Sequence, residues 1–398
     1  MCSRYGSVTV CLALWSFCAV LSGASEQRGQ GKYHVGFRIL RVDDGTDGTL
    51  VVALWYPTRS AARRSRYLPV IGHLEGCVAL DAEPAEGPFP LVVFSHGGIG
   101  AGACAMAWAE GLAAQGFVVA APDHKDKVVL LRSDAPAPPT RSRAYQAILW
   151  AMKLSRTKQR GSVAVSEYQH RPREIRATID ELIQASADAD SPLHGLVDAA
   201  RIGLTGVSFG AWTTLAMAGA VPWYRDGRIK AAVPMAPPVG NLAVARIRIP
   251  LMFIFGEKET IVLLDKRPSA PLKEKAVVAE YGAANAPKFL VGIQGAEHLD
   301  FDADGMMTRA SLRGRGMANR NTYTTAEVHR RDPVIRTILR FQLSFWQRYL
   351  LGDKEAERFL RNPDEPGVYL YRSQFSSRAS ASRSATGTTT EDEDKNQS

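Results

Sequence analysis

The sequence GVSFG at residues 206–210 constrains the fold of this 398-residue chain more than any other feature. It has the form G-x-S-x-G and lies between an apolar run at residues 201–205 and a helical pattern of small residues at 209–220. A serine on such a strand-to-helix turn is held in a strained backbone conformation, which small neighbours permit and which exposes its hydroxyl above a sheet. The motif therefore predicts that Ser208 is a nucleophile. The alternative is a chance glycine-serine turn.

A serine hydroxyl needs a base, and chains with this motif carry the acid and then the histidine after the serine. Of the eight histidines, only His298 and His329 follow Ser208. His329 lies in the charged stretch EVHRR, which is typical of a solvated helix. His298 follows the apolar run 289–293, so we expect it on a loop at the carboxyl end of a strand. His298 is the predicted base, and an ordinary surface histidine is the alternative.

The acid is expected after the preceding strand, where a carboxylate can orient the imidazole of the base. Residues 250–255 form that predicted strand, and the loop after it carries Glu257 and Glu259. Glu259 is the predicted acid because it lies far enough past the turn to reach His298, and Glu257 remains the competitor. A charge that only favours a helix N-terminus is the alternative role for Glu259.

A glycine-rich stretch supplies candidate donors for an oxyanion. The sequence HGGIG at residues 96–100 follows an apolar strand pattern at 90–95 and precedes a predicted helix from about 103 to 115. We expect the backbone amides of Gly98 and Phe209 to form the oxyanion hole. A phosphate-binding loop is the alternative, but the G-x-G-x-x-G and G-K-[ST] motifs are absent from the sequence.

The apolar runs predict an α/β fold with a mostly parallel central sheet and helices between the later strands. The first two runs are expected to form an antiparallel hairpin, and residues 333–352 a closing helix. The predicted strands lie near residues 35–41, 50–56, 90–95, 117–121, 201–205, 231–236, 250–255 and 288–293.

The two ends of the chain are expected to lie outside the folded domain. Residues 1–24 combine Arg4, a short apolar run and small residues, which predicts a signal peptide and a secreted or periplasmic protein; an uncleaved anchor is the alternative. Residues 25–371 are expected to form one domain, in which the long connection 125–173 is a lid or a plain insertion. Residues 372–398 are rich in Ser, Thr and Ala and are predicted to be a disordered tail.

Cysteine usage and charge limit the partners. In an oxidising compartment the pair Cys77 and Cys104 permits one disulfide, and an unpaired buried cysteine is the alternative. The formal charge of +9 permits peripheral contact with an anionic envelope surface, but no nucleic-acid motif accompanies it. No Cys/His cluster or H-E-x-x-H spacing occurs in the sequence, so we expect neither a metal nor a cofactor.

Several stretches resemble a known group of proteins. The runs VVFSHGG, GFVVAAPDHKD, RIGLTGVSFGAWTTLAMAG, PLMFIFGEKETIV and GAEHLDF are similar to the secreted serine esterases around platelet-activating-factor acetylhydrolase and the dienelactone-hydrolase-like bacterial proteins. The resemblance covers about residues 36–353. It implies an α/β-hydrolase fold with helices on both faces of the sheet, and the same roles for Ser208, His298, Gly98 and Phe209.

This chain departs from the pattern at the acid. Animal platelet-activating-factor acetylhydrolases take their acid from the strand after the nucleophile helix, where this chain has VPMA at residues 233–236. The bacterial relatives usually have Asp where Glu259 stands. Dienelactone hydrolase itself uses a cysteine nucleophile, so the resemblance does not imply dienelactone as substrate.

These observations predict a secreted serine hydrolase that cleaves small or lipid-like carboxylic esters through an acyl-enzyme intermediate. Amide or peptide hydrolysis by the same triad is one alternative. A catalytically inactive envelope-binding protein is the other, although the presence of both Ser208 and His298 argues against it.

Overall fold

A single eleven-stranded sheet organises the computed structural model, which describes residues 31–46, 48–71, 74–127, 129–137, 169–238, 242–259, 270–301 and 325–376. The spatial order of the strands is β11-β10-β9-β8-β7-β5-β6-β2-β1-β4-β3. Their bounds are β1 (His34–Val42), β2 (Leu50–Thr58), β3 (Arg63–Ser65), β4 (Gly76–Leu80), β5 (Phe89–Ser95), β6 (Val118–Pro122), β7 (Val197–Val207), β8 (Ile229–Met235), β9 (Leu251–Lys258), β10 (Lys288–Glu297) and β11 (Val368–Gln374).

The middle of the sheet is parallel, from β6 through β5, β7, β8 and β9 to β10. Every residue of β5 and β6 is buried, as expected for parallel strands that are covered on both faces. β1 and β2 pair as an antiparallel hairpin, and β2 joins β6 antiparallel. The eight predicted strands, the hairpin and the mostly parallel α/β sheet are therefore confirmed.

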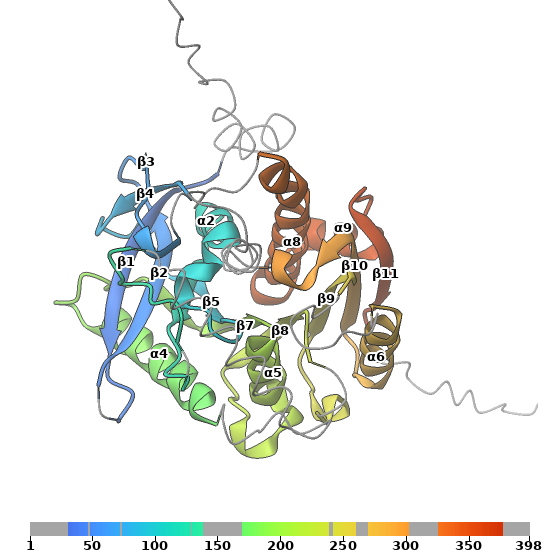
Figure 1. Cartoon of the computed structure of the whole chain (residues 1–398). Coiled ribbons are helices and arrows are strands. Elements are labelled where there is room, and N and C mark those ends of the chain that lie inside the picture. Colours follow the sequence, from blue (N-terminus) through green and yellow to red (C-terminus); the bar gives the residue numbers. More distant parts are fainter. Residues whose placement is uncertain are drawn as a thin grey trace, which may run out of the picture.

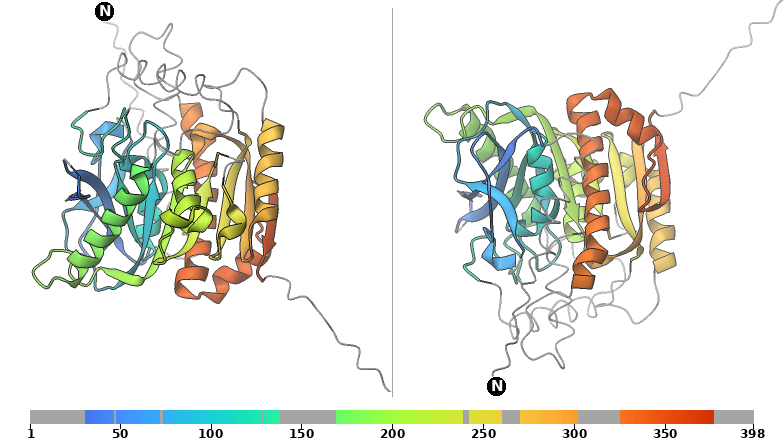
Figure 2. Two further views of the ribbon diagram at one scale, coloured as in Figure 1. Left: turned by 90° about the horizontal axis from the view of Figure 1, so that it is seen from below. Right: turned by 90° about the horizontal axis from the view of Figure 1, so that it is seen from above.

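Helices cover both faces of the sheet (Figures 1 and 2). On one face, α2 (Met106–Ala114) and α8 (Thr325–Leu351) pack over a core that includes Trp108, Phe341 and Trp346. The opposite face carries three more helices over two further clusters of buried apolar side chains. These three are α4 (His170–Ala187), α5 (Phe209–Leu215) and α6 (Ala270–Ala283). The predicted closing helix corresponds to α8, and the short helix α9 (Lys354–Arg361) follows it.

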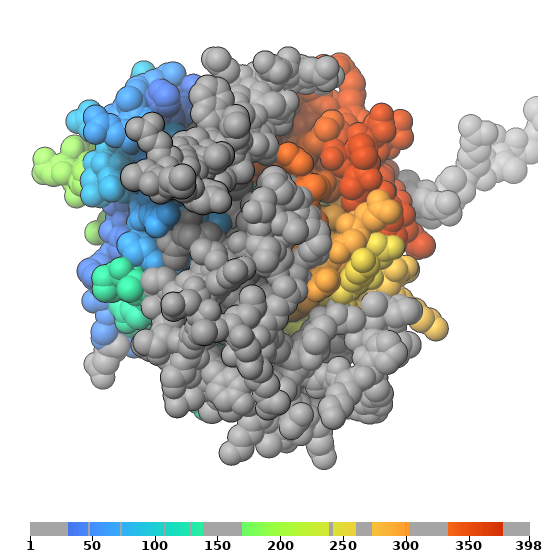
Figure 3. Space-filling view, turned by 45° about the horizontal axis from the view of Figure 1, so that its top comes forward, coloured from blue at the N-terminus to red at the C-terminus, as the bar shows by residue number. Residues whose placement is uncertain are grey.

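The predicted start of the disordered tail, residue 372, is too early. Residues 372–374 complete β11, and they pair antiparallel with residues 288–290 of β10. Phe375 then packs its ring edge-on against Phe289 at a centroid distance of 5.1 Å. The last three residues of this edge strand, RSQ at 372–374, are polar, so composition alone did not distinguish them from the tail that follows. In Figure 3 the C-terminal segments, in orange and red, form one flank of the molecule.

The long connection and the cysteines also differ from expectation. The predicted insertion 125–173 ends inside α4, which begins at His170. Its central part, residues 138–168, lies outside the described residues, as do the proposed signal segment 1–24 and the remainder of the tail. The structure contains no bond between Cys77 on β4 and the buried Cys104, so the permitted disulfide is not formed. Among the described helices, none is long and apolar enough to span a membrane.

Candidate active site

The predicted nucleophile lies on a sharp turn between β7 and α5. Ser208 has φ 54° and ψ −116°, a conformation that a residue with a side chain rarely adopts. Its amide donates a 3.0 Å hydrogen bond to the carbonyl oxygen of Met235 on the neighbouring strand β8. Gly210 lets the first turn of α5 lie against the end of β5, because a Cβ atom there would overlap the carbonyl oxygen of Ser95. The turn is thus held in its strained form by backbone contacts.

The structure brings the predicted base and acid to this serine. His298 follows β10, and its Nε2 lies 3.1 Å from the Oγ of Ser208. On the other side of the ring, Nδ1 lies 2.9 Å from Oε2 of Glu259, which follows β9. Glu257, the competitor, does not contact the histidine in this way; its Oε2 accepts a 2.8 Å hydrogen bond from the amide of Gly295. His329 lies within α8, and its side chain is outside the described residues.

Lys273 is a component of the site that sequence reasoning missed. It lies on α6, only 9% of its side chain is exposed, and it forms an ion pair with Oε2 of Glu259. Its Nζ also lies 3.3 Å from Nδ1 of His298. Lys273 lies fourteen positions after Glu259 in the sequence, and no sequence motif marks it as a partner of the acid.

The charge on Lys273 controls the ionisation of the acid. Burial alone raises the pKa of the Glu259 carboxyl, but Lys273 and then His298 outweigh burial and lower this pKa to about 2. Glu259 is therefore ionised at neutral pH, although only 1% of its side chain is exposed. An ionised carboxylate can accept the Nδ1 proton of the imidazole, which leaves Nε2 free to accept the serine proton.

The loop after β5 lies close to the residue that follows Ser208. A Cβ atom on Gly98 would lie 2.8 Å from the ring of Phe209, so the two predicted oxyanion donors are neighbours. His96, on the same loop, is completely enclosed, and burial lowers its pKa well below the usual range. Its Nε2 accepts a 2.9 Å hydrogen bond from the amide of His124, and Nδ1 lies 2.7 Å from the carbonyl oxygen of Gly97. The neutral ring thus joins two loops.

A second serine-histidine-carboxylate row lies beneath this loop. Ser95 Oγ is 2.7 Å from Nε2 of His124, whose Nδ1 is 2.7 Å from Oε2 of Glu174 on α4. None of the three side chains is a candidate to meet substrate, since Ser95 has no exposed surface and the His124 and Glu174 side chains are 0% exposed. The row ties β5, the loop after β6 and α4 together. Its interatomic distances resemble those of the row formed by Ser208, His298 and Glu259, so distances alone do not distinguish the two rows.

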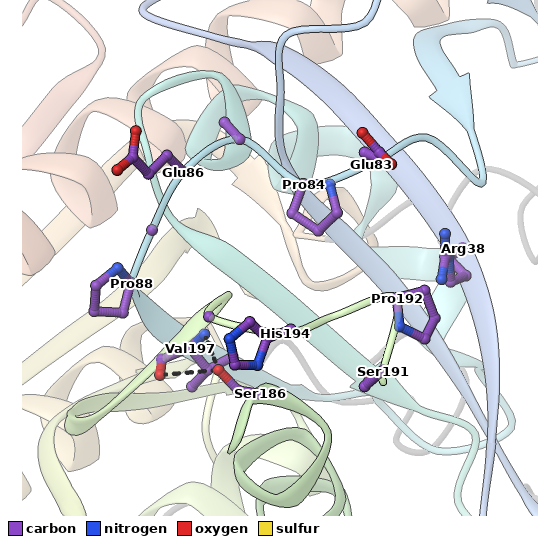
Figure 4. Close-up of a pocket in the computed structure, with 13 residues that line it drawn as sticks. Arg38, Glu83, Pro84, Glu86, Pro88, Ser186, Ser191, Pro192, His194 and Val197 are labelled. Atoms are coloured by element: carbon purple, nitrogen blue, oxygen red, sulfur yellow. Dashed lines mark hydrogen bonds between the residues drawn. The ribbon is translucent and has the colours of Figure 1, made fainter. Parts of the chain in front are cut away.

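A bound metal ion would need a cluster of ligating side chains in the described part of the chain. No group of three or more His, Cys, Asp or Glu side chains there is arranged to hold a metal ion. A pocket of about 650 Å³ opens near the amino ends of β5 and β7, between Glu86, His194 and Val197 (Figure 4). Ser208 lies at the carboxyl end of β7, so this pocket is at the opposite end of the strands from Ser208.

Comparison with known proteins places this geometry in context. The family model for platelet-activating factor acetylhydrolase, isoform II, matches residues 77–266. Platelet-activating factor acetylhydrolase of Cavia porcellus is 26% identical over 224 residues, which cover 50% of this chain and 47% of that protein. Cutinase 2 of Thermobifida cellulosilytica is 31% identical over 132 residues, which cover 31% of this chain and 47% of that protein. The chain thus spans about half the length of both relatives.

A solved structure extends the similarity to the fold. The ferulic acid esterase from Streptomyces cinnamoneus superposes with a TM-score of 0.57 at 20% sequence identity, covering 81% of this chain and 92% of its own. The predicted α/β-hydrolase fold is confirmed by this superposition together with the mostly parallel sheet. The chain thus has the α/β-hydrolase fold and is similar to the serine esterase group around platelet-activating-factor acetylhydrolase, the group that its motifs indicated.

Proposed function

We propose that this protein hydrolyses carboxylic esters through an acyl-enzyme formed on Ser208. The observation that carries the proposal is the continuous row from Ser208 Oγ to His298 Nε2, at 3.1 Å, and from His298 Nδ1 to Glu259 Oε2, at 2.9 Å. These distances lie within the range over which a serine, a base and an orienting carboxylate act together. The names of the three relatives, an acetylhydrolase, a cutinase and an esterase, support the same class of reaction.

Acylation begins when Nε2 of His298 takes the hydroxyl proton of Ser208 as Oγ attacks the ester carbonyl carbon. The carbonyl oxygen gains negative charge in the tetrahedral intermediate, and the amides of Gly98 and Phe209 donate to it. When the intermediate collapses, the C–O bond of the ester breaks, and His298 gives its proton to the departing alkoxide. The products are a free alcohol and an acyl group on Ser208.

Deacylation repeats these steps with water. His298 removes a proton from water, the resulting hydroxide attacks the acyl carbon, and the carboxylic acid leaves as Ser208 Oγ regains its proton. Throughout, the Glu259 carboxylate holds the Nδ1 proton of the ring and stabilises the imidazolium that forms at each transfer. Lys273 keeps that carboxylate ionised, because it offsets the effect of burial on the pKa of Glu259.

We further propose that the substrate is a small or lipid-like ester and that the protein works outside the cytoplasm. The apolar run that follows Arg4, with small residues at 22–25, supports an export signal. The mass of the mature N-terminus, measured on protein recovered from the native host, tests the location. An N-terminus near residue 25 is expected, and recovery of the protein with its N-terminus intact from the cytoplasmic fraction would contradict export.

The nucleophile is tested by labelling and by substitution. A fluorophosphonate probe should attach to Ser208, and Ser208→Ala should lose both the label and turnover of p-nitrophenyl butyrate by at least about 10³-fold. Ser95 is an internal control, because it has the same type of hydrogen bond to a histidine but no exposed surface. Label on the Ser95 peptide, turnover retained by Ser208→Ala, or preference for peptide over ester substrates would overturn the proposal.

The acid is tested by a matched pair of variants. Glu259→Gln should lower kcat by about 10²–10⁴-fold, because an amide cannot stabilise the imidazolium and favours the wrong ring tautomer. Glu257→Gln should retain nearly full activity, since that side chain bonds only the exposed amide of Gly295 among the contacts the structure gives it. If the losses are reversed between the two variants, Glu257 is the acid.

A further inference from the structure

A buried arginine holds the loop that carries the proposed oxyanion donor. Arg171 lies in the first turn of α4, and its side chain is 0% exposed. Its Nη1 donates to the carbonyl oxygen of His96 at 2.7 Å, and Nη2 donates to that of Gly97 at 3.2 Å. Two consecutive carbonyl groups of the loop after β5 are therefore fixed by one guanidinium group.

The guanidinium group is itself fixed from the other side. Nε and Nη2 of Arg171 donate to the two carboxylate oxygens of Asp126, at 3.0 and 2.5 Å. Burial raises the pKa of the Asp126 carboxyl, but Arg171 and His170 outweigh burial and hold that pKa well below its usual range. The paired carboxylate stays ionised, and the planar fork of the arginine is locked in one orientation.

The orientation of the Gly97 carbonyl determines where the next amide points. This carbonyl oxygen also lies 2.7 Å from Nδ1 of His96, so two donors converge on it. The peptide bond between Gly97 and Gly98 is trans, and in a trans peptide the C=O and N–H bonds point in opposite directions. A carbonyl directed at Arg171 therefore directs the amide of Gly98 away from α4.

The nucleophile elbow lies beside this peptide. Gly98 is in van der Waals range of the ring of Phe209, the residue after Ser208. We propose that Arg171 is a positioning residue that fixes the Gly97–Gly98 peptide so that the Gly98 amide faces the oxyanion before substrate arrives. This inference rests on the proposed ester hydrolysis. Its energetic basis is that a preorganised donor needs no reorientation during the reaction.

Kinetics of two substitutions test the role of the guanidinium fork. Arg171→Lys keeps the positive charge but cannot bridge two carbonyls and a carboxylate, and Arg171→Met removes the charge while keeping similar length. We expect kcat to fall about 10–100-fold in Arg171→Lys, with KM for p-nitrophenyl butyrate changed less than about threefold. The affinity for a trifluoromethyl ketone, which forms a tetrahedral oxyanion on Ser208, should fall by the same factor as kcat/KM. A merely structural role would not link these two quantities.

Arg176 provides a matched control on the same helix. It also donates to backbone carbonyls, including that of Tyr224 at 2.7 Å, and it lies 3.9 Å from a carboxylate oxygen of Asp226. Arg176→Lys should therefore change stability in a similar way but leave kcat and ketone affinity within about twofold of the wild type. If Arg171→Lys folds and keeps full kcat and ketone affinity, or loses them only as much as Arg176→Lys, the inference is wrong.

The two proposals can fail separately. If Ser208→Ala remains active, the proposed acyl-enzyme mechanism fails and the Arg171 experiment loses its basis. If Ser208→Ala is inactive while Arg171→Lys matches the wild type in kcat and in ketone affinity, only the positioning role of Arg171 fails. Thermal denaturation of each variant identifies any that does not fold, and Arg171→Lys is the decisive variant if Arg171→Met does not.

Discussion

At Nδ1 of His298, two side chains compete for one ring nitrogen. Glu259 Oε2 lies 2.9 Å from this nitrogen and Lys273 Nζ lies 3.3 Å from it. The nitrogen can donate a proton to the carboxylate or accept one from the ammonium group, but it cannot do both. Only the first arrangement leaves Nε2 able to accept the proton of Ser208. Lys273 thus keeps Glu259 ionised and also limits how strongly that carboxylate acts on the imidazole.

The first prediction concerns the removal of this ammonium group. In Lys273→Met the Glu259 carboxylate loses its cation, so burial raises the pKa of this carboxyl above the value of about 2 that it has beside Lys273 and His298. Because the proposed mechanism needs the ionised carboxylate, the acidic limb of the kcat/KM profile should move to higher pH. The profile measured from about pH 3 to 9 with p-nitrophenyl butyrate tests the shift.

Lys275 serves as the control for this prediction, because it lies on the same helix with its side chain exposed. Lys275→Met should give the wild-type profile within about 0.2 pH units, a bound set by the weak effect of exposed charges. An unchanged acidic limb in Lys273→Met would mean that the ion pair with Lys273 does not keep Glu259 ionised.

The residues that sequence could predict are those that follow a strand in a known order. Ser208 has a motif, and His298 and Glu259 follow apolar runs, so chain order alone placed each at the carboxyl end of a parallel strand. Lys273 and Arg171 lie on helices and reach the site through side-chain length and helix orientation. No local pattern encodes either quantity, so both needed three-dimensional coordinates.

At the scale of elements, the elbow depends on how closely α5 approaches the loop after β5. A Cβ atom on Gly210 would lie 2.5 Å from the carbonyl carbon of Ser95 and 2.8 Å from the carbonyl oxygen of His96. Both of these atoms belong to backbone, which cannot rotate away as a flexible side chain could. The glycine at the end of the motif therefore sets the distance between the nucleophile and the proposed oxyanion loop.

The second prediction is that Gly210→Ala separates these two elements. The added methyl group should push α5 away from β5, lower the free energy of unfolding by about 2–4 kcal/mol, and abolish turnover even in the folded fraction. Urea denaturation and activity per active site, titrated with a fluorophosphonate, measure the two effects. Wild-type stability with wild-type turnover would contradict the close approach.

Gly282 is the control for this substitution. It is exposed near the end of α6, and a Cβ atom there would meet no atom within 4 Å. Gly282→Ala should therefore leave activity unchanged and stabilise the protein by about 0.5–1 kcal/mol, because alanine loses less backbone entropy in a helix. Gly210→Ala should lower the free energy of unfolding and Gly282→Ala should raise it. This difference in sign distinguishes crowding of the backbone from the effect of glycine flexibility.

Predictability also differs among the elements. The strands of the parallel centre are buried on both faces and appear as unbroken apolar runs, so their positions were predicted within a few residues. β11 pairs through one edge only and is mostly half-buried, and its last residues, RSQ at 372–374, are polar like the tail that follows, so composition did not reveal where it ends. β3 and β4 are short and lie at the other edge of the sheet, where the same ambiguity concealed them.

For the whole molecule, parallel topology explains how residues 90 positions apart meet. β7, β9 and β10 run in the same direction, so the residues that follow them, Ser208, Glu259 and His298, emerge at one edge of the sheet. α4 and α6 then add buried cations behind this edge. The carboxylates that these cations hold ionised also make part of the folding free energy dependent on pH.

The last prediction follows from the ionisation of Glu259. The pKa of its carboxyl falls from 4.5 to about 2 on folding, so ionisation of this group stabilises the folded state relative to the unfolded state. The resulting stabilisation is fully present above about pH 4.5 and is lost as pH falls toward 2. By pH 3 the free energy of unfolding should have dropped by about 2 kcal/mol through this group alone.

Urea denaturation of wild type and Glu259→Gln at several pH values between 7 and 3 isolates this contribution. The amide cannot titrate, so the stability difference between the two proteins should shrink steadily below pH 4.5, because only the wild type loses the ionised pair with Lys273. Glu257→Gln, at an exposed position, should instead follow the wild-type curve at every pH. Parallel curves for wild type and Glu259→Gln would mean that Glu259 has the same affinity for a proton in the folded and unfolded states, and that the buried pair does not hold the acid ionised.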